Sequence, residues 1–304
     1  MFDILQQDMN KNIPYIFFGT GALAESVLAS LVRAGYIPSL VVTKPDSKQG
    51  RHMELTPPTI KVWAEIKGIE VLQPEKLDSE FLYSLQSSVY SLFIVASYGK
   101  IIPQDILDVP THGVLNVHPS LLPLYRGPSP IESVLLDGHM TTGVSIMKLD
   151  ALMDHGPILT QSAFMINPES NAGTLEVECG QLGGELLVQV LPHYLEGVLI
   201  PKEQNHAKAT ICKKITKDLG LVHLDNDIDI VRRKFRALTP WPSLYFFIEH
   251  AGRDIRVKIN QVDYVTEKDS RIAKDYIVSV TPEGKKQMDW ESFTRGYLGI
   301  DFSA

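Results

Sequence analysis

The first hundred residues alternate between short runs rich in β-branched and aromatic residues and longer stretches with helical periodicity. The runs expected as strands are residues 15–19, 40–43, 70–72 and 92–96, and the stretches expected as helices are 22–34, 59–67 and 79–86. Such a βαβα series predicts a mostly parallel sheet, flanked by helices and joined by right-handed crossovers. In an open sheet of this kind the ligand crevice lies outside the carboxyl ends of the strands.

The pattern changes toward the C-terminus. A further strand is expected at 143–149 and a long helix at about 174–195, and the polar residues 196–208 are expected as a linker. Short alternating strands then follow at 244–249, 255–261 and 276–281, with one basic helical stretch at 229–237. We therefore expect two domains, residues 13–195 with the parallel sheet and residues 209–304 as a small β-barrel with one helix.

The net charge of −7 is unevenly distributed. Up to Ala207 there are 12 Lys and Arg against 22 Asp and Glu, a net −10, whereas from Lys208 onward 17 stand against 14, a net +3. This argues against polynucleotide binding through bulk charge, although a local basic surface can still follow a phosphate backbone. The candidates are Lys213, Lys214, Lys217, Arg232, Arg233, Lys234 and Arg236. Solvated faces of helices and hairpins remain the alternative.

A glycine segment, Gly19-Thr20-Gly21-Ala22-Leu23-Ala24, follows an expected strand and opens an expected helix. It matches the G-x-G-x-x-G/A fingerprint of dinucleotide-binding proteins, and NAD binding is one interpretation. The next strand ends in Thr43-Lys44-Pro45 rather than in the acidic residue that would bind a ribose hydroxyl. A tight turn without a nucleotide is the other interpretation.

Asn116 and His118 are two residues apart at the end of an expected buried strand. Because a strand has a period of two, both side chains point to the same side and can meet one substrate atom. Acyl transfer without a covalent nucleophile needs such groups, with the amide stabilising an oxyanion and the imidazole donating to it and protonating the departing nitrogen. Asp154 could accept the proton of an attacking amine. A hydrogen-bonded loop and a turn residue are the structural alternatives.

Several classes are disfavoured by what the chain lacks. Its two cysteines, Cys179 and Cys212, make neither a disulfide framework nor a metal site, so we expect free thiols and no metal. The first residues are acidic and polar where a signal peptide would be basic and apolar, and no run of about 18 apolar residues occurs. We expect a cytoplasmic protein without membrane contact.

The segment Asn116-Val117-His118-Pro119-Ser120-Leu121-Leu122-Pro123, with Tyr125-Arg126-Gly127-Pro128-Ser129-Pro130-Ile131 after it, resembles the signature of the 10-formyltetrahydrofolate-dependent formyltransferases. The resemblance implies a Rossmann-like catalytic domain, formyl transfer from 10-formyltetrahydrofolate and a catalytic triad of Asn116, His118 and Asp154. It also implies a folate pocket, formed largely by backbone groups. Its residues would be Phe93, Ile94, Val95, Ala96, Ser97, Tyr98, Gly99, Ser120, Leu121, Leu122 and Pro123.

Within that family, three segments resemble the members that formylate the methionine of initiator tRNA. Residues 43–64 are similar to their inserted RNA-binding loop, and residues 236–242 and 282–293 to parts of their OB-like C-terminal domain. The resemblance implies initiator methionyl-tRNA as the partner of a monomeric enzyme. The residues expected to contact the tRNA are Lys44, Arg51, Lys213, Lys214 and Arg236.

The chain departs from the family pattern in three places. His52-Met53-Glu54 replaces a basic run after Arg51, so weaker loop contact with RNA is expected. Leu152 and His155 replace a glycine and a threonine beside Asp154, and Gly21-Ala22-Leu23 replaces a proline-containing turn. Two alternatives remain at this point. One is a sugar-nucleotide N-formyltransferase with the same core, and the other is a noncatalytic RNA- or NAD-binding protein that keeps the fold.

Overall fold

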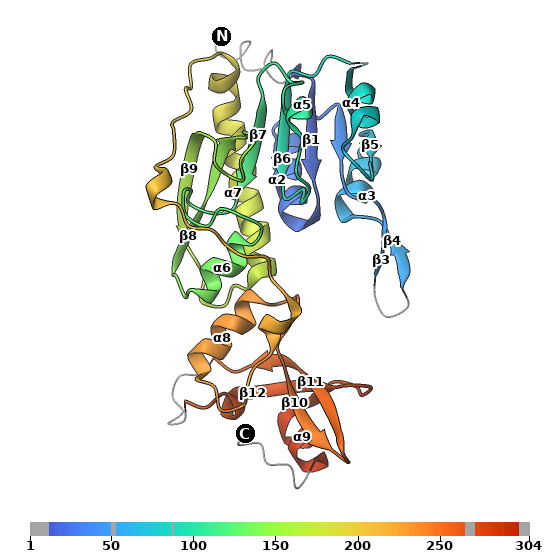
Figure 1. Cartoon of the computed structure of the whole chain (residues 1–304), viewed down its shortest axis with the longest axis vertical. Helices are drawn as coiled ribbons and strands as arrows, with labels where there is room; N and C mark the ends of the chain where they lie inside the picture. The colour runs from blue at the N-terminus through green and yellow to red at the C-terminus, as the bar shows by residue number, and fades with distance from the viewer. Residues whose placement is uncertain (1–11, 50–52, 87, 265–270, 298–304) are drawn as a thin grey trace. The chain divides into compact units, whose positions relative to one another are not determined.

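The computed structural model describes residues 12–49, 53–86, 88–264 and 271–297, and within these the chain forms two compact units (Figure 1). The first contains the described residues up to Pro130 together with 141–165 and 175–212. The second contains residues 131–140 and 166–174 and the described residues from Lys213 onward. Each unit is described separately below.

The first unit is built on a sheet in which seven strands are described, in the order β5-β2-β1-β6-β7-β8-β9. The strands are β1 (Tyr15–Gly19), β2 (Leu40–Val42), β5 (Val71–Leu72), β6 (Leu92–Ala96), β7 (Val114–His118), β8 (Thr141–Lys148) and β9 (Ile158–Met165). The strands from β5 to β7 run parallel, and β8 and β9 are antiparallel. The predicted mostly parallel sheet is confirmed. Strand β9 was not predicted: it lies at the edge of the described sheet, and its residues are mostly partly or fully exposed, with polar and apolar types mixed.

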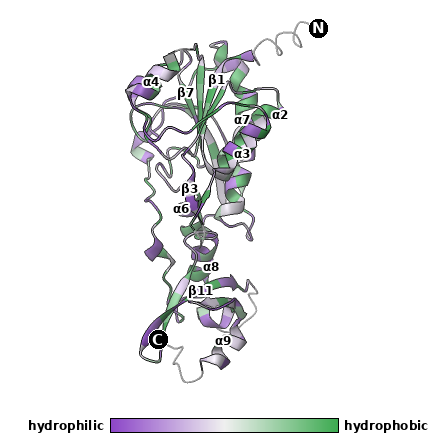
Figure 2. Ribbon diagram, turned by 90° about the vertical axis from the view of Figure 1, so that its right-hand side faces the viewer, coloured by the Kyte–Doolittle hydropathy of each residue, from purple (hydrophilic) through white to green (hydrophobic). Residues whose placement is uncertain are grey.

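Helices cover both faces of this sheet. They are α2 (Gly21–Arg33), α3 (Thr59–Ile66), α4 (Ser79–Gln86), α5 (Gln104–Leu107) and α7 (Ala172–Leu195), whereas α6 (Pro130–Leu136) belongs to the second unit from Ile131 onward. Figure 2 shows α4 on one side of the strands and α2, α3 and α7 on the other. On the α4 side, Phe81 and Leu85 pack against the strand residues Phe18 and Phe93 in one apolar core. Burial of each such side chain contributes about 1.5–3 kcal/mol to folding.

The glycine segment after β1 has a packing role in the structure. A Cβ atom at Gly19 would lie 2.6 Å from the Ala24 Cβ, 2.7 Å from the Phe17 ring and 3.0 Å from the carbonyl oxygen of Ala96. Only glycine therefore fits where β1 turns into α2 beside β6. The close approach of helix and strands accounts for this glycine without a nucleotide.

The segment expected as a linker, residues 196–208, belongs to the first unit. Lys202 and Ile158 exchange two backbone hydrogen bonds of 2.8 Å, and Arg126 forms a parallel bridge with Ile211. The chain passes into the second unit after Cys212. Composition suggested a linker because the segment is polar, but the side chain of Gln204 is buried there and hydrogen-bonded.

The second unit contains an antiparallel sheet with the described strand order β10-β11-β12-β13. Its strands are β10 (Tyr245–His250), β11 (Arg253–Val262), β12 (Ile277–Pro282) and β13 (Met288–Asp289), and its helices α8 (Ile228–Ala237) and α9 (Trp290–Gly296). The three predicted strands and the basic helix are confirmed. Helix α9 was not predicted, but its start is well defined, since the Asp289 carboxylate accepts a 2.7 Å hydrogen bond from Ser292 N.

Candidate active site

Strand β7 presents Asn116 and His118 on one face of the sheet. Val117 points to the opposite face, where it lies directly against Gly183 of α7. In a strand, Asn116 and His118 must then share the other face, at the carboxyl end of the parallel strands. Asn116 is 9% exposed and His118 is 4% exposed. The sequence-based prediction that the two side chains point the same way agrees with this geometry.

Asp154 meets His118 at this edge. Its Oδ1 lies 3.5 Å from His118 Nδ1, and its Oδ2 accepts a 2.8 Å hydrogen bond from the backbone N of Gly127. The other ring nitrogen, Nε2 of His118, lies 2.9 Å from the carbonyl oxygen of Tyr125. A carbonyl can only accept, so Nε2 carries a hydrogen. The carboxylate is thus aimed at the imidazole, and a group that takes the Nε2 proton must displace the Tyr125 carbonyl.

The Asn116 carboxamide, unlike the His118 imidazole and the Asp154 carboxylate, has no hydrogen-bond partner among the residues that the structure describes, although Asn116 is buried. Among the described residues Tyr98 Oη alone is a fully buried side-chain polar atom without a partner, so the unbonded Asn116 amide reaches the surface, where a substrate oxygen can accept from it. This is the observation that best marks the edge of β7 as a binding position.

The loop that follows β7 is held in shape by two strands. The Ser145 hydroxyl on β8 donates to Ser120 O at 2.6 Å and accepts from Leu122 N at 3.0 Å. The Gln161 side-chain amide on β9 donates to Leu122 O and to Ser145 Oγ, both at 2.8 Å. Sequence reasoning missed Ser145 and Gln161. A serine within an otherwise apolar strand was the only available signal.

The structure separates the residues predicted for the folate pocket into two groups. Phe93, Ile94, Val95 and Ala96 are buried strand residues of β6, and Val95 pairs with Asn116 in the parallel register. Ser97 and Gly99 are exposed at the end of the strand with φ of +49° and +72°. The accessible residues of this segment are therefore Ser97 and Gly99, with the buried Tyr98 between them.

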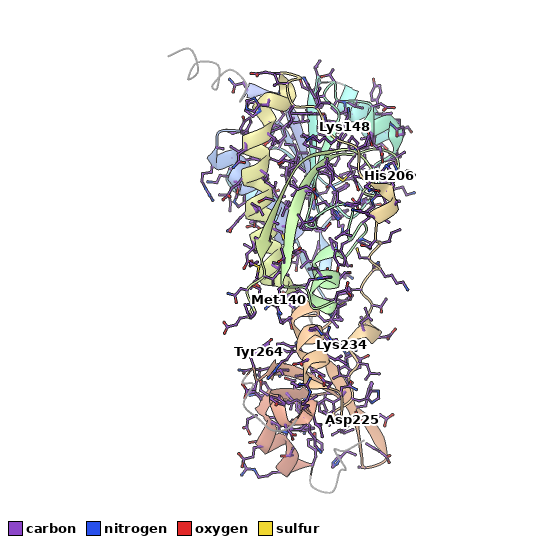
Figure 3. All side chains as sticks on the ribbon, turned by 90° about the vertical axis from the view of Figure 1, so that its left-hand side faces the viewer. Met140, Lys148, His206, Asp225, Lys234 and Tyr264 are labelled. Carbon is purple, nitrogen blue, oxygen red and sulfur yellow. The ribbon has the colours of Figure 1, made fainter. Side chains whose placement is uncertain are left out.

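The loop around Asp154 takes an unusual course that His155, one of the two departures, helps to fix, whereas the side chain of Leu152, the other departure, is exposed. Asp154 has φ of +49°, in the left-handed region that side chains other than glycine seldom adopt. His155 Nδ1 lies 2.7 Å from Asp150 Oδ2, and its ring stacks on His206 at a centroid distance of 4.1 Å. Gly156 must be glycine, since a Cβ would collide with Lys148 O. Figure 3 labels His206, on which the His155 ring stacks, and Lys148, whose carbonyl oxygen faces Gly156.

The residues predicted to contact tRNA differ in their availability. Lys213 and Lys214 are exposed, and Arg51 lies outside the described residues. Lys44 is partly buried, with its Nζ 2.7 Å from where a Cβ of Gly99 would stand. Arg236 on α8 is occupied within its own unit, donating to Ser170 O at 2.7 Å and to Asn167 O at 3.2 Å. Burial lowers the pKa of the Arg236 guanidinium.

A hairpin carries the rest of the predicted RNA loop. Strands β3 (Ser47–Gln49) and β4 (Glu54–Thr56) pair antiparallel. At their base the Asp46 carboxylate accepts from Gln73 Nε2 at 2.7 Å and from Lys61 Nζ at 3.0 Å. Those two hydrogen bonds, first that of Gln73 and then that of Lys61, hold the pKa of Asp46 below its usual value. The hairpin is thus anchored to α3 and to the end of β5.

Two kinds of feature, a metal-binding cluster and a membrane-spanning helix, are not found in the described residues. In them, no cluster of three or more His, Cys, Asp and Glu side chains is arranged to hold a metal ion. None of their helices has both the length and the apolar character needed to cross a membrane.

The fold and the site together define a class of protein. A Rossmann-like sheet carries an amide, an imidazole and a carboxylate at its carboxyl edge, and this set suits transfer of a small acyl group to an amine.

A formyl transferase family model matches residues 11–191. The methionyl-tRNA formyltransferase of Chloroflexus aggregans is 44% identical over 233 residues, which are 76% of this chain and 75% of the relative. That of Thermodesulfovibrio yellowstonii is 36% identical over 92% of this chain and 95% of its own length. The chain therefore belongs to the formyl transferase family, among the methionyl-tRNA formyltransferases.

Solved structures share the fold at low identity. HypX from Aquifex aeolicus, in complex with tetrahydrofolic acid, has a TM-score of 0.66 at 14% identity over 94% of this chain. The chain spans about half of that protein, 48% of its length. An N-formyltransferase from Helicobacter canadensis, in complex with folinic acid and dTDP-3-aminofucose, has a TM-score of 0.59 at 17% identity over 86% of this chain and 96% of its own. These likenesses confirm the architecture.

Proposed function

We propose that this protein transfers the formyl group of 10-formyltetrahydrofolate to the α-amine of methionine on initiator methionyl-tRNA. The product would be N-formylmethionyl-tRNA for translation initiation. The observation that carries the proposal is the His118–Asp154 pair beside the unpartnered Asn116 amide, in a chain whose relatives are methionyl-tRNA formyltransferases.

The three side chains would divide the work as follows. The Asn116 amide donates to the formyl oxygen as it gains negative charge, which is the usual means of lowering the barrier to acyl transfer. His118 exchanges Tyr125 O for the substrate, donating through Nε2 to the oxyanion and then to the departing nitrogen. Asp154 takes the proton that the attacking amine loses, directly or through a water, and passes it to His118 Nδ1, which lies 3.5 Å from its Oδ1, so that the imidazole ends neutral. No covalent bond to the enzyme is required.

The formyl donor would be held by backbone groups on both sides of Asn116. One set is at Ser97 and Gly99, which are exposed at the end of β6, and the other is at 120–123, which Ser145 and Gln161 hold in place. Folate ligands in the structures of HypX and the Helicobacter canadensis enzyme support this choice of donor. Ser145 and Gln161 already bind main-chain groups of Ser120 and Leu122, so the loop 120–123 would shape the pocket, and the exposed residues Ser97 and Gly99 would offer main-chain groups to the donor.

The tRNA would be bound by the hairpin β3–β4 and by the second unit. The part of the chain from Lys208 onward carries the net positive charge, and Lys213 and Lys214 are exposed there. Arg236, in contrast, contributes to the folding of its own unit, because its Nε and Nη2 donate to Ser170 O and Asn167 O. The RNA contact of Arg51 and the expected monomeric state stay predictions.

Substitution of Asp154 tests the chemical step. Asp154→Asn keeps an acceptor for Gly127 N but cannot take a proton, so kcat should fall by about 10²–10⁴-fold with KM nearly unchanged. Thermal melting should stay at the wild-type value. Asp108→Asn, the same change at an exposed carboxylate of the first unit, is the matched control and should retain full activity. Wild-type turnover by the Asp154 variant would refute the assigned role.

A further inference from the structure

We propose that Gln204 and Arg126 are positioning residues that aim the Asp154 carboxylate at His118. This inference rests on the proposed function, because Asp154 matters only if the site transfers protons. Neither residue reaches the reacting atoms. Each acts through the backbone on which the catalytic pair is mounted.

Gln204 holds the Asp154 loop from the segment that had been expected as a linker. Its side-chain amide Nε2 donates to Asp154 O at 3.0 Å and to Gly156 O at 2.7 Å. The residue is 6% exposed, so water does not compete freely for these carbonyls. One carbonyl belongs to Asp154 itself, which has φ of +49°, and the other follows two residues later; such a φ persists only where its surroundings over-determine it. Gln204 supplies such restraints.

Arg126 fixes which way the Gln204 amide points. Its Nε and Nη2 donate to Gln204 Oε1 at 3.2 and 2.7 Å, and Nη2 also donates to His206 Nδ1 at 2.9 Å. Within the described residues no carboxylate pairs with this guanidinium, which is 8% exposed. A buried cation held by a neutral amide and a neutral imidazole indicates that geometry, more than charge neutralisation, is being served.

The neighbours of Arg126 complete the link. On one side Tyr125 O is the acceptor for His118 Nε2, and on the other Gly127 N donates to Asp154 Oδ2. Asp154 is therefore held at its carboxylate by Gly127 N and at its carbonyl by Gln204, which Arg126 orients. His118 is held by Tyr125 O. Loss of the Gln204 or the Arg126 side chain would let the carboxylate shift against the imidazole, and a displacement of about 1 Å can cost about 100-fold in rate.

Gln204→Glu is the sharpest variant. It keeps the size of the side chain and an acceptor for Arg126, but it removes both donors to Asp154 O and Gly156 O. We expect kcat to fall about 10- to 100-fold, with KM for both substrates within about twofold of wild type. Glu203→Gln, the reverse exchange at the exposed neighbouring residue, is the matched control and should leave kcat unchanged.

The decisive readout is the double variant. If Gln204 acts through Asp154, then Gln204→Glu should reduce kcat much less in an Asp154→Asn background than in the wild type. Equal reduction in both backgrounds, or wild-type kcat in Gln204→Glu alone, would overturn the inference. Arg126→Lys, which keeps the charge but cannot span both acceptors, gives the same test should Gln204→Glu fold poorly.

If the wild-type protein showed no formyl transfer, the proposed function would be refuted, and kinetics could no longer test whether Gln204 positions Asp154. A crystal structure of the full-length Gln204→Glu protein then decides it. The inference expects Asp154 to leave the left-handed region and its Oδ1 to move away from His118 Nδ1. An unchanged loop would contradict it.

Discussion

At the scale of single residues, Tyr98 shows how a buried polar atom can be left over by a fold. The residue is 2% exposed, and its ring packs edge-on against Phe18 at a centroid distance of 5.4 Å. Its hydroxyl has no hydrogen-bond partner in the described part of the chain. Burial raises the pKa of this phenol to about 12. The hydroxyl group is thus desolvated without compensation.

Tyr98→Phe should therefore raise the free energy of unfolding by roughly 1 kcal/mol, because it removes an unsatisfied hydroxyl and keeps the ring. Urea denaturation of the two proteins measures the difference. Tyr15→Phe is the matched control, since the Tyr15 hydroxyl is equally buried but donates to Tyr36 O at 2.9 Å. In Tyr15→Phe the free energy of unfolding should fall by about 1 kcal/mol, because a buried hydrogen bond is removed. Destabilisation by Tyr98→Phe would show that its hydroxyl has a partner.

The residues proposed to react could be identified from the sequence, but the residues that hold them in position could not. The spacing of Asn116 and His118 on one strand is local information, and Asp154 followed from a family motif. Gln204 contacts Asp154 from 50 residues away, and Gln161 contacts Leu122 from 39. Such partners carry no local signal, because a polar residue that will be buried looks the same in sequence as one that stays exposed.

At the scale of elements, helix α8 shows that a run of basic residues need not be an RNA-binding surface. Arg232 donates to Asp263 O, Lys234 to Leu221 O and Arg236 to Ser170 O. Burial lowers the pKa of Lys234 and that of Arg236. These side chains tie α8 to loops of its own unit. Figure 3 labels Lys234 on this helix.

Arg236→Ala should destabilise the second unit by about 2 kcal/mol, since it leaves two carbonyls without their charged donor. The comparison is Arg233→Ala, because Arg233 Nε donates at 3.3 Å to Asp229 O within the same helix. Its removal should cost less than about 0.5 kcal/mol. Calorimetric melting of the full-length proteins distinguishes the two variants. Equal melting temperatures would mean that Arg236 is free to serve RNA instead.

Most elements of the catalytic sheet could be located within a residue or two from periodicity. The elements that were missed, in either unit, lack a strong hydrophobic period, and four of them illustrate this. Strand β9 is an exposed edge, β3 and β4 have three residues each, and α9 has seven. Their stability comes from pairing and packing with distant segments, which local propensity does not encode.

At the scale of the whole molecule, the division into two units agrees with the change of pattern along the chain. The boundary differs, because the polar segment before Lys213 is part of the first unit and carries Gln204. The activity proposed above joins the two units, with chemistry in the first and positive charge concentrated in the part of the chain that forms most of the second. The choice of acceptor is the claim on which this account depends most.

That choice is measured directly in one reaction. The protein is incubated with 10-formyltetrahydrofolate and equal concentrations of methionyl initiator tRNA and a nucleotide-linked amino sugar, with methionyl elongator tRNA and uncharged tRNA in separate controls. We predict that formylmethionine is recovered after mild hydrolysis of the tRNA ester, that the sugar is unchanged, and that the control tRNAs give little product. A formylated sugar without formylmethionine, or no product at all, would contradict the account.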